Sequence, residues 1–297
     1  KNFIFLKFLI FMTKYLVKLI IFNTIGKIVK LFFRLLVNKN KIFIINYHTT
    51  YPEFNNNFLE QIKFFKEYFD IVDLESIKNF KCSKKPKLIL TFDDGHVSNF
   101  QISKILQKEK IPAVFFIPVN FVYRDSEDNL KQEYDLAINK FSILSDYNLD
   151  KKNNYERLSM THENLLELID KNFKVGCHSL NHIRLNNNLS TNELQREVVE
   201  SKLILEQNLK TKIDYFCWVI GDKKSYSSRA YNLIKENYEL SFMTLCESFK
   251  INSDYHKIHR FNVETNFSLN QVAFILSGIY EVMYKKRRAE LNNILSK

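Results

Sequence analysis

From residue 42 onward, the chain alternates short, continuous hydrophobic runs with segments in which apolar residues recur every three or four positions. The hydrophobic runs are rich in β-branched and aromatic residues, as in buried strands, and the longer spacing is typical of amphipathic helices. Strands are expected at residues 42–47, 87–92, 113–117, 173–177, 215–218, 239–244 and 258–263. Helices are expected between them, at residues 57–69, 98–109, 161–171, 190–209, 227–237 and 269–284. This repeated alternation predicts an α/β fold with a mainly parallel sheet.

The same pattern divides the chain into three parts. Residues 42–285 contain neither an internal repeat nor a linker, so we expect one domain there. Within it, residues 119–160 are polar and weakly periodic, which predicts an insertion or long loop with some helix. Residues 1–41 precede the domain as amphipathic helices with a break expected at 23–26, and residues 286–297 follow it as a short basic tail.

Charge is concentrated at the two ends of the chain. A formal net charge of +11 raises the possibility of nucleic-acid binding. Residues 1–41, however, carry nine basic residues and no acidic one, and residues 281–297 are also basic, which leaves residues 42–280 close to neutral. A neutral body does not provide the basic groove that a nucleic acid needs, so we expect no nucleic-acid partner.

The basic residues of the N-terminal segment lie on one helical face in its first half and on an offset face in its second. They are Lys7, Lys14 and Lys18, then Lys27, Lys30 and Arg34. These charges interrupt the apolar sequence too often for a membrane-spanning helix. Basic amphipathic helices are suited to an anionic membrane surface, and we expect residues 1–41 to be a peripheral membrane anchor. The alternative is a helix that covers the domain with its apolar face inward.

Cysteine usage bears on the compartment. The four cysteines are far apart in the sequence and form no CxxC pair: Cys82, Cys177, Cys217 and Cys246. They are expected to be small buried residues rather than a disulfide framework or a zinc site. The N-terminal segment also lacks the small-residue cleavage site of a signal peptide. These features favour the cytoplasmic side of the membrane over export.

Polar residues with metal-binding chemistry directly follow two of the expected strands. Asp93 and Asp94 follow the first, and His178 and His182 follow the second. Two adjacent carboxylates after a buried strand are costly unless they pair or bind a cation, and two histidines four positions apart can face one metal ion. Taken alone, the first pattern is usually a cap or turn and the second often a solvated face. Together, one aspartate and two histidines leave coordination positions open for water and substrate, which is typical of a catalytic metal.

Other strand ends also carry polar residues or glycine. His48 ends the first expected strand, although such a histidine alone is more often a satisfied strand-end residue. The strand at 215–218 runs into a loop that contains Gly221. Arg260 lies in the last expected strand, from which it could reach the site.

Several of these segments together resemble the polysaccharide deacetylase family (NodB homology, carbohydrate esterase family four). The resemblance covers roughly residues 42–265 and rests on motifs in the family's order: Asn46-Tyr47-His48, LTFDDGHVSNF, IPAVFFIP, VGCHSLNH, FCWVIGD and IHRFNV. It implies a distorted (β/α) barrel of about seven parallel strands. It also implies metal-dependent removal of acetyl groups from amino sugars.

Carried over by position, the resemblance implies a role for each of these residues. Asp94, His178 and His182 are expected to bind a divalent metal ion, with Zn²⁺ favoured, and Asp93 is expected to be the general base. The early Tyr-His pair is similar to the branch that deacetylates poly-N-acetylglucosamine-type exopolysaccharides, which makes His48 the expected general acid.

The third motif departs from the family. It reads Trp218-Val219-Ile220-Gly221, without the arginine or prolines that are common there, which leaves open what orients Asp93. Trp218, Gly221 and Arg260 are candidate substrate-binding residues, although a buried core position is nearly as well supported for Trp218.

The sequence therefore predicts a metal-dependent hydrolase that removes N-acetyl groups from an amino sugar. The expected substrate is an acetylated amino-sugar polymer of the cell surface or a lipid-linked glycan precursor. Two alternatives remain open: an O-acetyl esterase of the same family, and a catalytically degenerate protein that binds glycan or acts as a scaffold.

Overall fold

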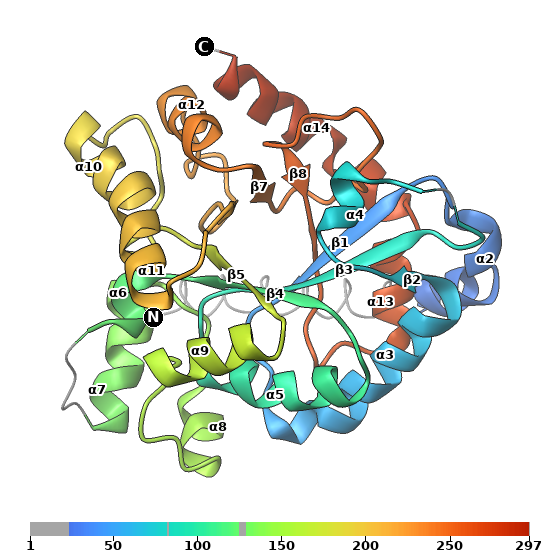
Figure 1. Cartoon of the computed structure of the whole chain (residues 1–297). Coiled ribbons are helices and arrows are strands. Elements are labelled where there is room, and N and C mark those ends of the chain that lie inside the picture. Colours follow the sequence, from blue (N-terminus) through green and yellow to red (C-terminus); the bar gives the residue numbers. More distant parts are fainter. Residues whose placement is uncertain (1–23, 82, 125–128, 297) are drawn as a thin grey trace, which may run out of the picture.

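The computed structural model describes residues 24–81, 83–124 and 129–296, which form a barrel of strands surrounded by helices (Figure 1). Its strands are β1 (Ile42–Tyr47), β2 (Asp70–Ile71), β3 (Lys87–Phe92), β4 (Ala113–Ile117), β5 (Lys174–Cys177), β6 (Tyr215–Cys217), β7 (Leu240–Met243), β8 (Ile258–His259) and β9 (Phe261–Asn262). They form one sheet in the order β8-β7-β6-β5-β4-β3-β1-β9, with β2 paired to the start of β3. Every strand pair is parallel, as the sequence predicts.

The last strand segment closes the ring. β8 pairs with β7, whereas β9, which begins two residues after the end of β8, pairs with β1. Only Arg260 separates the two short strands, so one stretch of chain bridges both edges of the sheet. Counted as one, β8 and β9 give a barrel of seven strand positions, with β2 outside the ring. The predicted distorted barrel of about seven parallel strands is confirmed, and its last strand is interrupted at Arg260.

The helices lie around this barrel. They are α2 (Phe33–Leu36), α3 (Asn55–Tyr68), α4 (Glu75–Lys78), α5 (Val97–Lys108), α6 (Val119–Val122), α7 (Leu130–Asp135), α8 (Tyr147–Lys152), α9 (His162–Asp170), α10 (Thr191–Gln195), α11 (Ser201–Leu209), α12 (Ser228–Asn237), α13 (Leu269–Leu276) and α14 (Ile279–Leu295). Short helical turns at Pro52–Phe54, Leu136–Lys140 and Arg196–Glu200 extend α3, α7 and α10. Ser190 and Glu193 form a capping box before α10, which explains why that helix begins there.

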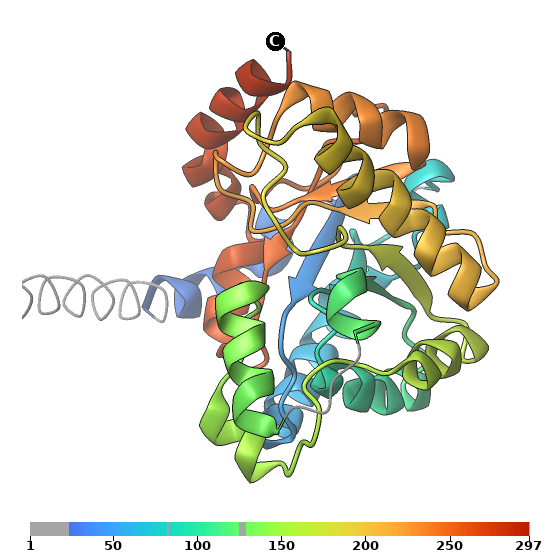
Figure 2. The same cartoon turned by 90° about the vertical axis from the view of Figure 1, so that its left-hand side faces the viewer.

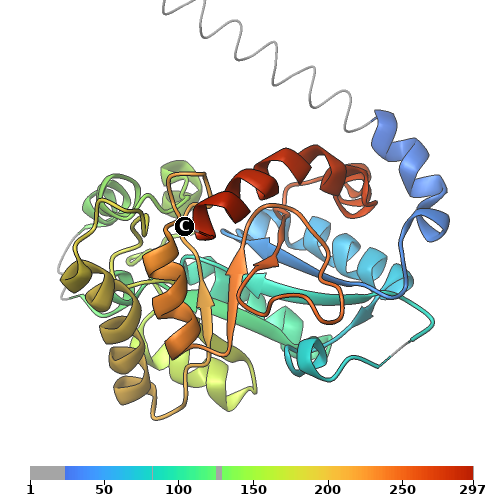
Figure 3. The same cartoon turned by 90° about the horizontal axis from the view of Figure 1, so that it is seen from above.

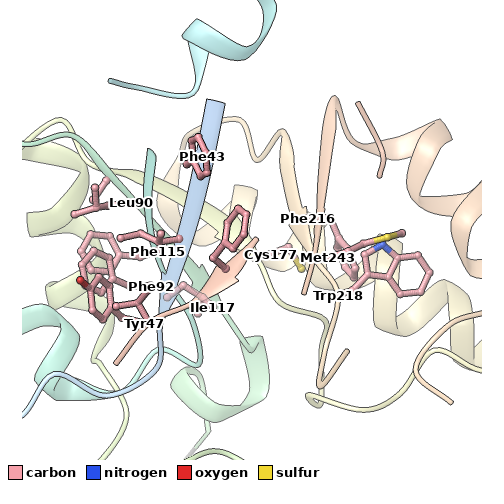
Figure 4. Close-up of a cluster of buried hydrophobic side chains, with 14 of the residues drawn as sticks. Phe43, Tyr47, Leu90, Phe92, Phe115, Ile117, Cys177, Phe216, Trp218 and Met243 are labelled. Atoms are coloured by element: carbon pink, nitrogen blue, oxygen red, sulfur yellow. The ribbon is translucent and has the colours of Figure 1, made fainter. Parts of the chain in front are cut away.

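Alternation along the strands separates an inner from an outer hydrophobic layer. Ile42 and Ile44 of β1 belong to a cluster shared by most barrel strands, whereas Phe43 and Ile45 belong to the large cluster under the helices. Successive strand residues point to opposite faces, so the first cluster fills the barrel and the second packs beneath the helices. Figure 4 shows part of the outer layer, including Phe43. Near the carboxyl ends of the strands the inward positions become polar, and the site lies there.

Residues 119–160 contain α6, α7 and α8 and have a small hydrophobic cluster of their own with Tyr51. A fully buried contact between polar side chains joins this segment to the barrel, because Asp150 Oδ1 lies 3.3 Å from Nε2 of His96. His96 comes two residues after Asp94. The insertion is therefore packed directly against the loop that carries the two adjacent carboxylates.

The two ends of the domain differ from the expected boundaries. Residues 24–31 are helical, so Thr24-Ile25-Gly26 does not break the N-terminal helix, and the interruption lies at Phe32. Asn23 and the Lys7, Lys14 and Lys18 face lie outside the described residues.

At the other end, the boundary predicted at residue 285 falls inside α14. Leu291 and Leu295 of this helix are buried in the main core, so residues 286–295 are part of the packed domain rather than a tail. The expected single helix at 269–284 is also divided, because Gly278 adopts φ +86° between α13 and α14. Within the described residues, no helix combines the length and apolarity needed to cross a membrane.

Candidate active site

Asp94, His178 and His182 converge at the carboxyl ends of β3 and β5. One carboxylate oxygen of Asp94 lies 3.4 Å from Nε2 of His178 and 3.1 Å from Nε2 of His182. All three side chains are buried, and their ligand atoms lie within 4.8 Å of one another. Two imidazole nitrogens and one carboxylate oxygen that meet at a point are the ligand set of a catalytic divalent metal.

The other ring nitrogen of each histidine supports this interpretation. Nδ1 of His178 lies 2.8 Å from the carbonyl oxygen of Cys217, and Nδ1 of His182 donates to the carbonyl oxygen of Phe141. A carbonyl can only accept, so a neutral form of either ring carries its proton on Nδ1 and leaves the Nε2 lone pair free for a metal. Phe141 belongs to the 119–160 insertion, which therefore orients a candidate metal ligand.

The backbone around these ligands is strained. Asp94 has φ +70° and His182 has φ +54°, both in the left-handed region that residues other than glycine seldom adopt. Gly95 follows Asp94 with φ +62°, as expected for a sharp turn beside the carboxylates. Around His182, the carboxylate of Glu197 accepts hydrogen bonds from the backbone nitrogens of Leu180 and Asn181. Strain held by such contacts clusters at functional sites.

Asp94 is ionised in this environment. Burial alone raises its pKa, but the charges and hydrogen bonds of His182 and His178 hold the pKa well below its usual range. A carboxylate that stays charged at neutral pH suits a metal ligand.

The adjacent Asp93 is held by Arg260 rather than by the histidines. Nη1 and Nη2 of Arg260 each lie 2.7 Å from a different oxygen of Asp93, and the guanidinium is fully buried. Despite desolvation, the Arg260 charge lowers the pKa of Asp93. The prediction that Arg260 binds substrate is not supported, because alternation along the last strand turns its side chain inward onto Asp93. Arg260 therefore orients the Asp93 carboxylate, a task that the third motif leaves unexplained.

Arg260 also contacts a second group of side chains whose atoms could bind a metal ion. Asp93, His178 and Cys217 bring an oxygen, a nitrogen and a sulfur within reach of one another. Nη2 of Arg260 lies 2.8 Å from the Cys217 sulfur and also contacts Asp93. A guanidinium charge already occupies this position, which disfavours a cation there, and so the cluster around Asp94 is the candidate metal site.

His48 follows β1 and contacts a carboxylate that the sequence analysis missed. Its Nδ1 lies 2.6 Å from Oε1 of Glu264, just beyond β9. Desolvation lowers the pKa of His48, but the Glu264 charge outweighs it and the pKa rises to about 10. The imidazole is therefore protonated at neutral pH and can donate a proton. Glu264 directly follows the strand expected at 258–263, so the strand-end reasoning applied to Asp93 could have identified it.

His48 and Asp93 lie next to each other at the ends of neighbouring strands. β1 and β3 pair in register up to Tyr47 and Phe92, one residue before each. The side-chain amide of Asn99 donates to the carbonyl oxygens of both residues, at 2.7 Å for His48 and 3.0 Å for Asp93. The structure thus brings the expected acid and base together.

Trp218 and Gly221 do not join this cluster. Trp218 is only 1% exposed and lies in the outer hydrophobic layer (Figure 4). Its ring packs against Tyr226, with centroids 5.0 Å apart. It points away from the barrel interior, so its position does not support the predicted substrate contact. Gly221 has φ +83°, and a Cβ there would meet Oγ1 of Thr244 at 1.7 Å. The Gly221 position is explained by this turn, without a substrate.

A cavity of about 290 Å³ lies beside Glu264, the partner of His48. Glu264 and Thr49 line it on the barrel side, and Leu144 and Leu149 line it from the insertion. Tyr51 and Phe54 add aromatic surface. Ser145, Asp146, Thr265 and Asn266 complete the lining, so the cavity combines apolar and aromatic surface with several hydrogen-bonding groups.

Comparison with known families identifies the class of protein. Residues 80–237 match the sequence profile of the family described as Polysaccharide deacetylase. This match spans more than half of the chain, and the chain belongs to the polysaccharide deacetylase family. It includes Asp93, Asp94, His178 and His182 but not His48, Arg260 or Glu264. No curated protein sequence is a significant match.

Solved structures share the fold at low sequence identity. A polysaccharide deacetylase from Bacillus cereus is 18% identical with a TM-score of 0.59, covering 80% of this chain and 69% of its own. IcaB from Ammonifex degensii is 18% identical with a TM-score of 0.57, at 80% and 97% coverage. A de-N-acetylase from Aggregatibacter actinomycetemcomitans is 17% identical with a TM-score of 0.58, at 80% and 100% coverage. At these identities the likeness shows the barrel fold, and family membership supports a carbohydrate deacetylase function.

Proposed function

We propose that the protein is a metal-dependent deacetylase that removes N-acetyl groups from amino sugars. The observation that carries this proposal is that three groups lie together at neighbouring strand ends: an ionised ligand cluster, an oriented carboxylate and a protonated histidine. Asp94, His178 and His182 would hold the metal. Two imidazoles and a carboxylate suit Zn²⁺ among the common divalent ions.

A bound divalent metal supplies Lewis-acid polarisation of the acetyl carbonyl and makes a coordinated water more acidic. Asp93 takes a proton from the attacking water. Arg260 keeps the carboxylate ionised and prevents it from rotating, so one geometry is presented to the water. This is general base catalysis by an oriented group, which typically contributes about 10²–10⁴-fold in rate.

His48 then protonates the departing nitrogen. An amine anion is a very poor leaving group, so amide cleavage needs a proton donor more than ester cleavage does. Glu264 keeps His48 in the imidazolium form and holds the ring by its Nδ1, which leaves Nε2–H to donate. This pair favours the N-deacetylase over the O-acetyl esterase of the same family.

We propose a polymeric or lipid-linked amino sugar as the substrate. The IcaB and de-N-acetylase folds are similar to this chain, which is compatible with the poly-N-acetylglucosamine branch suggested by Tyr47-His48. The cavity beside Glu264 supports recognition of a sugar unit next to the acid, because its aromatic residues can pack against a sugar ring.

The test combines metal analysis with acetate release from N-acetylhexosamine oligomers, an O-acetylated glycan and lipid-linked acetylated sugars. Acetate from the N-acetylated substrates that is lost after chelation and restored by Zn²⁺ is the expected result. Preferential release from the O-acetylated glycan would support the esterase. Binding of oligomers without metal and without acetate release would support a glycan-binding protein instead.

A further inference from the structure

The helical segment formed by residues 24–36 is docked on the barrel by one of its faces. Gly26, Val29 and Phe33 are buried, and they follow one another at helical spacing. The Gly26 backbone approaches α13 so closely that a Cβ would meet the carbonyl oxygen of Asn270 at 2.1 Å. Phe33 meets the ring of Tyr68 edge-on, at 5.0 Å between centroids. These contacts fix which side of the segment faces outward.

The outward side is also apolar. Six large hydrophobic side chains are exposed over these 13 residues: Ile25, Ile28, Leu31, Phe32, Leu35 and Leu36. Leu31 is 79% exposed and Leu35 is 83% exposed, values at which a leucine gains almost nothing from folding. Scattered exposed leucines are ordinary, but a contiguous apolar face on a docked helix marks an interaction surface.

The start of α14 adds to this surface. Ile279, Val282 and Met283 are exposed, with Val282 at 71%. Figures 2 and 3 show residues 24–36 and α14 on the same side of the barrel, with α13 between them. Lys41, which lies between the N-terminal segment and β1, forms an ion pair with the start of α14, with its Nζ 3.1 Å from the carboxylate of Glu281. We call the exposed residues 25, 28, 31, 32, 35, 36, 279, 282 and 283 the apolar flank.

Positive charge borders the apolar flank. Lys27, Lys30 and Arg34 follow one edge of the N-terminal segment, which has no acidic residue between 24 and 36. Arg34 has Glu67 within 3.6 Å, but both side chains are largely exposed. Lys285 and Lys286 lie on exposed positions just beyond Met283. Apolar side chains bordered by lysines complement a surface that is hydrocarbon inside and anionic outside.

We propose that the apolar flank is a docking surface for an anionic lipid bilayer. Leu31, Leu35 and their neighbours enter the interface, and the lysines contact lipid phosphates. The surface lies on the side of the barrel, over α13 and the end of α3, rather than at the strand ends. Docking therefore leaves the active site open along the membrane surface. The proposal does not depend on the identity of the substrate.

Depth-dependent tryptophan quenching tests this surface directly. The native Trp218 is buried and gives a constant background. In the full chain, Leu35→Trp and Val282→Trp place a reporter on each part of the apolar flank. On vesicles of phosphatidylglycerol and brominated phosphatidylcholine, emission from each reporter is expected to fall by roughly half, since interfacial helices bury their apolar face about 5–10 Å deep. Leu203→Trp is the matched control on α11, where Leu203 is 48% exposed, and should not be quenched.

Vesicle sedimentation gives a second measurement. Leu31→Gln/Leu35→Gln removes two exposed leucines without touching the buried face, and the partition coefficient is expected to fall by at least about tenfold. Leu166→Gln/Leu203→Gln removes two exposed leucines elsewhere and should bind like the parent. Lys27→Gln/Lys30→Gln should weaken binding to anionic vesicles and reduce its salt dependence.

Three outcomes would overturn the proposal. The first is a reporter at position 35 that is quenched no more than the one at position 203. The second is binding by Leu31→Gln/Leu35→Gln that equals that of the parent. The third is self-association in lipid-free solution that is abolished by Leu31→Gln/Leu35→Gln, which would make the apolar flank an interface between two copies of the chain.

Discussion

The proposed metal-ligand cluster and the proposed acid–base pair lie side by side at the carboxyl ends of the strands, but the chain builds them differently. Asp94, His178 and His182 come from two short motifs, and each histidine is oriented by a backbone carbonyl. Asp93 and His48 instead depend on the side chains of Arg260 and Glu264, which are separated from them by more than 160 residues. Backbone carbonyls are present whatever the sequence, whereas a side-chain partner can be lost by one substitution.

The difference has a chemical reason. Metal ligands need only lone pairs at one point, which two tight loops can supply. An acid and a base must hold opposite protonation states a few ångströms apart, so each needs a counter-charge of its own. The segment that contains β8 and β9 supplies both counter-charges, Arg260 between the two strands and Glu264 after β9, because it joins the two edges of the sheet.

The largest expected effect is the loss of the metal cluster. Asp94→Ala removes the carboxylate that both Nε2 atoms face, and bound Zn²⁺ measured by elemental analysis should fall to background. Deacetylation should drop by about 10⁴-fold or more, because the Lewis acid and the activated water are lost together. His162→Ala, at the start of α9 and outside the site, is the control. Full metal content with near-normal turnover in Asp94→Ala would contradict the assigned ligand set.

Asp93→Asn distinguishes the role of the proposed base from metal binding. The amide keeps the shape of the side chain but cannot accept the water proton, so kcat should fall by about 10²–10⁴-fold. Metal content should stay at one ion per chain, because Asp93 is not among the three ligands. If the variant lost its metal as Asp94→Ala does, the division between cluster and base would be wrong.

The sequence predicted more of the metal-ligand cluster than of the acid–base pair and its supporting side chains. TFDDG and HSLNH are local, and strand periodicity alone places both at one end of a parallel sheet. The pairing of Asp93 with Arg260 depends instead on barrel closure, which brings a residue of β8–β9 across the lumen from β3. The 258–263 run was predicted as one ordinary strand, and nothing in its periodicity shows that it pairs on both sides.

Two misassigned residues follow from the same limitation. Trp218 and Arg260 both occupy strand ends, and composition alone cannot distinguish an inward from an outward side chain until the register is known. With the register known, Arg260 shares the inward face of Ile258, and Trp218 shares the outward face of Phe216. One residue of register reverses the face on which a side chain lies.

Arg260→Gln tests the long-range support of the base. It leaves the Asp93 carboxylate buried without its counter-charge, which typically destabilises a protein by about 3–5 kcal/mol. Thermal unfolding should therefore shift markedly, and the pKa of Asp93 should rise. Arg184→Gln is a matched control, because Arg184 also contacts both oxygens of an aspartate, Asp222, but on the surface. Its effect should stay within about 1 kcal/mol. If the two substitutions lowered the stability equally, the Arg260–Asp93 pair would be no different from an ordinary surface ion pair, and its proposed role in positioning Asp93 would be wrong.

Glu264→Gln is expected to have the smallest effect and tests the acid alone. Glu264 raises the pKa of His48 to about 10, so removing its charge lowers the pKa of His48. The acid acts in its protonated form, and the alkaline limb of the kcat/KM profile should therefore move to lower pH. Turnover below that limb should change by only about tenfold, since the ring and the metal ligands remain. Glu281→Gln, which removes a carboxylate paired with Lys41 instead, should leave the limb unchanged.

The pairing of His48 with Glu264 also makes the stability of the protein depend on pH. Because the pKa of His48 is raised from 6.5 in the unfolded chain, the pair stabilises the fold fully below about pH 6.5 and loses this contribution as pH rises through about 10. The difference in Tm between the parent and Glu264→Gln should therefore be largest in mild acid and narrow toward pH 10. An alkaline limb that stays in place while Tm follows this course would mean that the pair supports the fold and that another group delivers the proton.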